Sequence, residues 1–124
     1  MNRYANDFEE LDIFKKARRL VTEIYELTKR EEFYRDYALR DQIRRAGISV
    51  MSNIAEGFDR GDKEFKKYLN ISRGSCMEIK SQLIIARDLN YIEESDYEDK
   101  AEQCRVLSAM TKSLMNYLES QNDH

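Results

Sequence analysis

Apolar residues recur at steps of three and four along almost the whole chain, which is the period of an amphipathic α-helix. Four such stretches predict helices over about 7–30, 37–60, 63–89 and 96–119, with a frayed tail at 120–124. No sustained alternation of β-branched and polar residues indicates a strand. Short connections between long helices favour antiparallel neighbours. The pattern therefore predicts an all-α chain, folded as an antiparallel up-down four-helix bundle in a single domain, 1–124.

Residues with strong preferences for helix ends flank these stretches. Gly61 fits a stop for the second helix, and Asp62 fits an N-cap for the third. The segment 31–36 is interpreted as a charged connection. Serine, asparagine or aspartate three residues before glutamate can form a capping box. Asn6 with Glu9, or Asp7 with Glu10, is expected to do so at the start of the first helix, and Ser95 with Glu98 at the start of the fourth.

The segment 45–57, RAGISVMSNIAEG, is unusually polar for a core helix. On a helical wheel its apolar positions still fill an arc of about 200°, wider than the stripe of about 100° that a bundle helix usually buries. The third helix has a smaller excess at Met77, Ile84 and Ile85. Extra apolar area on a small domain predicts a second buried interface, most simply with other copies of the chain.

Composition narrows the class of protein. Of the 124 residues, 36% are charged and 41% hydrophobic, which is typical of an ordered soluble domain. No segment has the length and apolarity of a membrane span, and the N-terminus lacks a signal core, so we expect a cytoplasmic protein with no membrane partner. Cys76 and Cys104 lack CxxC spacing and fall on apolar stripes. They are interpreted as buried free thiols.

The formal net charge of −3 argues against a general polyanion binder. Two basic clusters nevertheless stand out, at 15–19 and 40–45. They are interpreted first as solvated helix faces with local ion pairs, such as Glu26 with Arg30. The alternative is contact with structured RNA, which oligomerisation would strengthen. The residues available for such contact are Lys15, Lys16, Arg18, Arg19, Arg44 and Arg45.

Three segments, SVMSNIAEGFDR, KEFKKYLNISRGSCMEIKSQL and ARDLNYI, together resemble the four-helix-bundle family of bacterial 23S rRNA intervening-sequence proteins. The resemblance implies a small homo-oligomer, often a pentameric ring, without a demonstrated biochemical activity. A relative of similar fold, the accessory protein of diversity-generating retroelements, binds a reverse transcriptase and nucleic acid. The family commonly has proline where this chain has Met51, so the second helix is expected to run straighter here.

The family motifs, carried over by position, fall on Ser52, Asn53, Ile54, Ala55, Glu56 and Gly57, and on Arg73, Gly74, Ser75 and Glu78. Glycine costs about 1 kcal/mol in a helix relative to alanine, which is tolerable where another helix must approach closely. The two glutamates would need hydrogen-bonded partners if buried, with Arg73, Arg45 and Asn53 as candidates. We interpret the set as a polar seam that fixes helix register or subunit orientation. The alternative is a groove for a ligand or partner.

Nothing in the sequence points to catalysis. His124 is the only histidine, so no histidine-based triad or zinc site is expected, and no glycine-rich phosphate loop is present. The chain is therefore predicted to be non-catalytic, without metal or cofactor. Two hypotheses follow. One is a homo-oligomeric scaffold or adaptor for a protein encoded nearby, such as a reverse transcriptase. The other is a nucleic-acid-binding accessory protein that uses the basic clusters.

Overall fold

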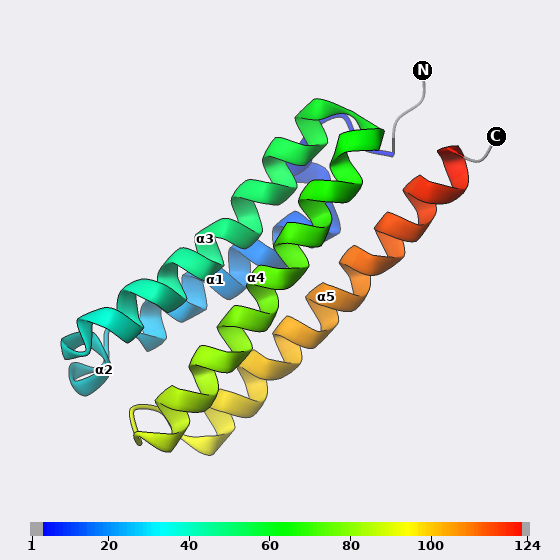
Figure 1. The fold of residues 1–124 in the computed structure, drawn as a ribbon. Helices are drawn as coiled ribbons and strands as arrows, with labels where there is room; N and C mark the ends of the chain where they lie inside the picture. Colours follow the sequence, from blue (N-terminus) through cyan, green and yellow to red (C-terminus); the bar gives the residue numbers. More distant parts are fainter. Residues whose placement is uncertain (1–3, 123–124) are drawn as a thin grey trace.

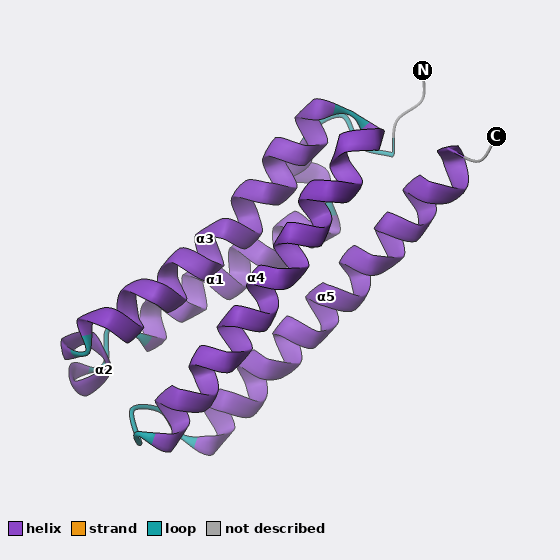
Figure 2. Ribbon diagram, viewed as in Figure 1, coloured by secondary structure: helices purple, strands orange, loops and turns teal. Residues whose placement is uncertain are grey.

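The computed structural model describes residues 4–122, and all regular elements within this range are helical (Figures 1 and 2). In chain order they are η1 (Phe8–Glu10), α1 (Asp12–Leu27), α2 (Glu31–Arg35), α3 (Tyr37–Arg60), α4 (Asp62–Asp88) and α5 (Glu94–Asn122). Helix α3 packs against α1 and α4, and α5 packs against α4 and α1. The all-α prediction is confirmed, and the four long helices form a helical bundle.

The chain enters the bundle through a short turn rather than through one continuous first helix. Asp7 Oδ1 accepts a hydrogen bond from Glu9 N at 3.3 Å, and Asn6 N donates to Glu10 Oε2 at 2.9 Å. These bonds cap the 3₁₀ turn η1. Leu11 then takes an extended conformation, with φ −69° and ψ 132°, before α1 begins. The prediction of a single helix over 7–30 is therefore wrong at both ends, since α1 ends at Leu27.

The segment interpreted as a connection contains the helix α2, which closes one end of the bundle. The Phe33 side chain is fully buried, and its ring centroid lies 5.5 Å from that of Tyr91. The Tyr91 hydroxyl donates to Asp36 Oδ2 at 3.0 Å, and Asp36 Oδ1 accepts from Leu39 N at 3.1 Å as the N-cap of α3. One aromatic pair and one shared carboxylate thus tie α2, α3 and the α4–α5 connection together.

A single residue joins α3 to α4. Gly61 ends one helix and precedes the next, with φ +95°, a backbone conformation that residues with a Cβ rarely adopt. Asp62 lies inside the first turn of α4 and makes no side-chain cap. The prediction of Asp62 as an N-cap is therefore wrong. The first turn of a helix nevertheless favours a carboxylate, because the backbone N–H groups there carry partial positive charge.

Helix α4 ends in a Schellman motif. Asn90 has φ +62°, its N–H donates to Arg87 O, and Tyr91 N donates to Ala86 O, each at 2.9 Å. Helix α5 then starts at Glu94, where Asp96 Oδ2 accepts from Glu93 N at 2.9 Å. The predicted capping box on Ser95 is wrong, because Ser95 already lies inside the helix and Asp96 supplies the cap. Of the predicted frayed tail, 120–122 belong to α5 and 123–124 lie outside the described residues.

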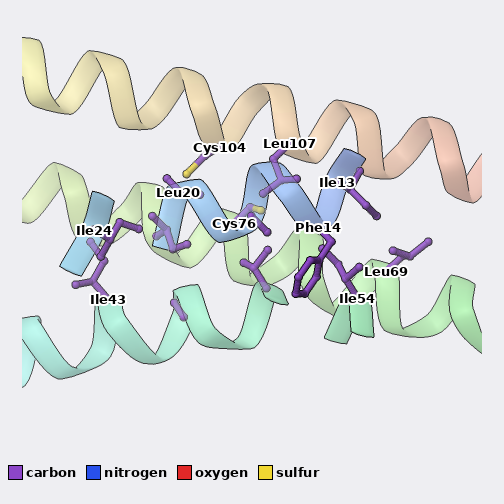
Figure 3. Close-up of a cluster of buried hydrophobic side chains, with 14 of the residues drawn as sticks. Ile13, Phe14, Leu20, Ile24, Ile43, Ile54, Leu69, Cys76, Cys104 and Leu107 are labelled. Carbon is purple, nitrogen blue, oxygen red and sulfur yellow. The ribbon is translucent and has the colours of Figure 1, made fainter. Parts of the chain in front are cut away.

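The core is a cluster of buried aliphatic and aromatic side chains to which all four long helices contribute (Figure 3). Cys76 on α4 and Cys104 on α5 belong to it, and both are free and buried, as predicted. Burial raises the pKa of the Cys76 thiol to about 11 and that of Cys104 to about 12, so both are protonated at neutral pH. Across the helices described, none is long and apolar enough to cross a membrane.

Candidate functional site

Helices α3 and α4 approach each other closely at Gly57, in the first family motif. A Cβ atom placed there would lie 2.5 Å from Tyr68 Cβ and 2.9 Å from Phe65 Cδ1, well inside van der Waals contact. Any side chain would push the two helices apart. The prediction of a close approach at this glycine is confirmed.

Serine hydroxyl groups bridge the same two helices about two turns further along, and an asparagine of α3 supports them. The Ser72 hydroxyl donates to Val50 O at 3.0 Å, and the Ser75 hydroxyl donates to Ser49 Oγ at 2.9 Å. Asn53 Nδ2 donates to Ser49 O at 2.8 Å and to Ser49 Oγ at 3.1 Å. These neutral groups satisfy one another in a partly buried contact, where an unpaired polar group is costly. Ser49 and Ser72 were absent from the predicted motif set. The signal in the sequence that could have identified one of them is the position of Ser72 on the apolar stripe of α4.

Other motif residues make no contact between α3 and α4. Glu56 and Glu78 are exposed, and Glu56 pairs with Arg60 of its own helix at 3.0 Å. Ser52 is also exposed. A Cβ atom at Gly74 would meet nothing within 4 Å. Within the chain, neither glutamate is buried and no helix approaches Gly74 closely, because these positions lie on the outer surface.

Arg73, a candidate partner for the two glutamates, contacts α5 instead. Its Nε donates to Ser108 Oγ on α5 at 3.3 Å. Arg45, the other candidate partner, is exposed on α3. The second motif thus divides between two sides of α4, with Ser75 against α3 and Arg73 against α5. A single polar seam that includes all the motif residues does not exist within one chain.

Large apolar side chains remain exposed on the outer side of α4, beside its contact with α3. Ile71 is 52% exposed and Ile85 is 48% exposed. Positions 71, 78 and 85 are spaced by seven, so they share one face with Gly74. Nearby, Gln82 Oε1 is buried and has no hydrogen-bond partner among the residues described. This outer α4 stripe, defined as Ile71, Gly74, Glu78, Gln82 and Ile85, therefore combines exposed apolar area with an unsatisfied acceptor.

Some of the basic residues predicted to contact RNA instead contact other residues of the chain. Arg44 Nε donates to Thr28 Oγ1 at 2.8 Å, and its guanidinium lies 4.4 Å from the Tyr25 ring centroid. Arg40 lies between two tyrosines, 4.5 Å from the centroid of Tyr34 and 4.9 Å from that of Tyr37. These arginines hold the α2 end of the bundle through cation–π contacts. The predicted pairing of Arg30 with Glu26 is also wrong, because Arg30 makes its ion pair with Asp96.

Arg19 belongs to a charged network between α1 and α5. Glu23 accepts from Arg19 Nε at 2.7 Å and from Lys100 Nζ and Gln103 Nε2 at 2.9 Å each. Lys100 Nζ also donates to Asp99 Oδ2 at 2.7 Å. Partial burial opposes ionisation of Glu23. The hydrogen bonds from Gln103, Arg19 and Lys100 outweigh it and lower the pKa of Glu23 to about 2.

The remaining predicted contact residues are exposed on α1, at Lys15, Lys16 and Arg18. The structure does not bring them together with Arg44, which is partly buried beneath α2. Among the residues placed by the structure, no group of three or more histidine, cysteine, aspartate and glutamate side chains is arranged to hold a metal ion.

Comparison with known proteins identifies the lineage. The family model of the 23S rRNA-intervening sequence protein matches residues 9–113. The chain belongs to this family. A crystal structure of a protein of unknown function from the S23 ribosomal protein family of Bacteroides thetaiotaomicron aligns with a TM-score of 0.77 and 22% identity, covering 83% of this chain and 97% of that one. That similarity establishes a shared fold. No curated protein matches the sequence.

Proposed function

We propose that this 23S rRNA-intervening sequence protein is a cytoplasmic, non-catalytic homo-oligomeric scaffold, with a pentameric ring as the expected assembly. The observation that supports this proposal is the outer α4 stripe. Two isoleucines about half exposed to solvent flank a glycine with open space above it and a buried amide oxygen without a donor. A neighbouring copy would cover the apolar area and could supply the missing hydrogen bond.

Gly74 suits such a contact, because the absence of a side chain lets a second backbone approach the helix surface. It thus resembles Gly57, which allows the close approach of α3 and α4 within the chain. Glu78 lies on the same stripe and is exposed. At the interface it would require a cationic or hydrogen-bonding partner from the second copy, which would also orient the subunits.

The adaptor role follows from the oligomer. A ring of identical bundles displays several copies of one surface, so a partner with repeated contacts gains avidity. We propose that such a partner is a protein encoded nearby, for instance a reverse transcriptase. Nucleic-acid contact through the predicted basic set is less well supported, since Arg44 and Arg19 already have partners within the fold.

Light scattering coupled to size-exclusion chromatography tests the assembly. We expect a mass near five times the 14.8 kDa of one chain. The double variant Ile71→Arg/Ile85→Arg should elute as a monomer with unchanged helical circular dichroism. Ile48→Arg is the matched control, because Ile48 is 46% exposed but lies on α3 away from the stripe. A wild-type protein with the mass of a monomer would contradict the proposal.

A further inference from the structure

The long helices follow one another around the bundle in the order α1, α3, α4 and α5, and α5 closes the circle against α1. The outer α4 stripe lies beside the contact of α4 with α3. The contact between α1 and α5 is therefore on the opposite side of the bundle. Subunits that meet through the stripe leave this opposite side exposed, where a partner of the oligomer can reach it.

Helices α1 and α5 are the most loosely packed pair of neighbouring long helices, and their contact is hollowed. Three cavities follow one another along it, with volumes of about 260, 170 and 200 Å³ from the start of α1 to its end. The first and largest of these three is named the α1–α5 groove. It is defined by Glu10, Leu11, Asp12, Ile13, Met110 and Leu114.

The two smaller cavities are lined mainly by charged side chains that pair within the chain. Glu23 and Lys100 form an ion pair at 2.9 Å across the contact. Arg30 pairs with Asp96, and Glu102 pairs with Arg105 of its own helix. A ligand at these cavities would have to displace ion pairs that already satisfy the charges. The α1–α5 groove is the part of the contact that differs.

The floor of the groove is apolar, and an apolar row continues beside it along α5. Leu11 and Ile13 are buried, at 7% and 4% exposure. On α5, apolar side chains follow at steps of four, four and three, which places them on one face over about three turns, or about 17 Å. They are Val106, Met110, Leu114 and Tyr117. None of the four is fully buried, and Tyr117 is 47% exposed.

The rim of the groove is acidic. Residues 4–14 contain four carboxylates and no lysine or arginine. Two of these carboxylates, Glu10 and Asp12, are exposed beside the groove. Glu10 accepts a hydrogen bond from the backbone N–H of Asn6, and Asp12 forms no ion pair with any residue that the structure describes. Apolar area next to carboxylates without cations is complementary to a ligand that carries both apolar and cationic groups.

We propose that, given the adaptor role on which this assignment rests, the α1–α5 groove binds a cationic amphipathic helix of the partner protein. The apolar side chains of such a helix contact Met110 and Leu114, and its lysines or arginines lie beside Glu10 and Asp12. Helices that bind in grooves use apolar anchors at steps of three and four, which is the spacing of the apolar row on α5. Because every subunit carries the groove, repeated contacts add avidity.

Other classes of ligand fit the groove less well. The acidic rim repels the phosphates of nucleic acid and of anionic lipids. An extended peptide finds no sheet edge to pair with, since all regular elements of the described residues are helical. A small organic cation could fill the cavity but would leave the apolar row toward Tyr117 uncovered.

The test measures fluorescence anisotropy of labelled synthetic peptides with the full chain at about 50 mM salt. The probe is a peptide of about 14 residues, made of leucine and lysine, with the leucines at helical steps of three and four. One comparison peptide has the same composition in scrambled order, and the other has glutamate in place of lysine. We expect the probe to bind about tenfold or more tightly than either comparison peptide.

Two variants each remove one feature of the groove. Glu10→Gln/Asp12→Asn removes the rim charges, so it should weaken binding about fivefold and reduce its dependence on salt. Met110→Gln keeps the side-chain length but makes the apolar row polar, so it should weaken binding about fivefold at any salt concentration. The matched control, Glu32→Gln/Glu98→Gln, removes the same charge from exposed carboxylates outside the groove, and it should change affinity less than about twofold.

Several outcomes would overturn the proposal: no binding of the probe by the wild-type protein, equal binding of the scrambled peptide, or equal losses in the groove and control variants. A lower oligomeric mass for Met110→Gln would do the same, because it would show that a second copy of the chain occupies the groove. Circular dichroism checks the fold of each variant, and the rim variant changes only exposed side chains.

Light scattering keeps this proposal separate from the oligomer, because no variant of the groove alters the outer α4 stripe. A wild-type oligomer that does not bind the probe contradicts the assignment of the groove alone. A wild-type monomer that binds the probe contradicts the oligomeric scaffold alone.

Discussion

The contacts of α3 with α4 and of α1 with α5 solve the same packing problem with different chemistry. At the first, Gly57 lets two backbones approach and Ser72 bonds a carbonyl across the contact, so every bridging group is neutral. At the second, the carboxylate of Glu23 accepts hydrogen bonds from two cations, Lys100 and Arg19, in a partly exposed network. Gly57 and Ser75 of the family motifs belong to the first contact, and no motif residue belongs to the second.

The contact between α3 and α4 depends on how closely the helices fit, and the contact between α1 and α5 depends on electrostatic attraction. The neutral contact has no group that titrates near neutral pH, so its contribution to stability should be indifferent to pH and salt. The charged contact depends on ionised partners and is screened by salt. Substitutions in the two contacts can therefore be distinguished by how their effect on stability depends on pH and salt, as well as by the magnitude of that effect.

The largest effect is expected for Gly57→Ala. The new Cβ would lie 2.5 Å from Tyr68 Cβ, so helix α4 must shift or distort. Overpacking of this kind costs about 3 kcal/mol, which exceeds the gain of about 1 kcal/mol from better helix propensity. Urea denaturation followed by circular dichroism measures the loss. A variant as stable as the wild type would show that close approach is not what the first motif glycine provides.

Glu23→Gln should lower the free energy of unfolding by about 2 kcal/mol at pH 7, since it removes charge-assisted hydrogen bonds that are partly shielded from solvent. The pKa of Glu23 is about 2 in the folded chain, below its ordinary value of 4.5. Its contribution is thus complete above pH 4.5 and is lost as the pH falls toward 2.

The difference in stability between Glu23→Gln and the wild type should therefore shrink steadily from pH 5 to pH 2, and should also shrink in high salt. Gly57→Ala provides the contrast, because its cost should stay constant across the same conditions. A pH-independent cost for Glu23→Gln would mean that the α1–α5 contact depends on packing rather than on charge.

Ser49→Ala should cost about 1 kcal/mol, because it removes the oxygen that Ser75 and Asn53 both use. The cost should be as insensitive to salt as that of Gly57→Ala. Ser52→Ala is the matched control, since the exposed hydroxyl of Ser52 lies outside the contact and its loss should be close to neutral. Equal costs for the two serines would contradict the role of Ser49 in the contact between α3 and α4.

Hydrophobic periodicity was enough to find the long helices, because burial of an apolar stripe is what stabilises them. It could not locate the break at Leu11, which depends on tertiary burial of that side chain, nor α2, whose five residues are too few to show a period. The glycines were correctly recognised as unusual, yet the sequence alone could not separate Gly57, packed against α4, from Gly74, open to solvent. That distinction depends on the rotation of each helix in the bundle.

Gly74→Ala is the smallest expected change and the sharpest test of this distinction. With nothing within 4 Å of the new Cβ, the substitution should stabilise an isolated chain by about 0.5–1 kcal/mol through helix propensity alone. If the outer α4 stripe is the subunit interface, the same methyl group should weaken assembly, because it occupies space reserved for a second backbone. Urea denaturation at high dilution reports the first effect, and light scattering across a concentration series reports the second. A variant that is more stable and fully assembled would mean that the glycine of the second motif serves neither the fold nor the oligomer.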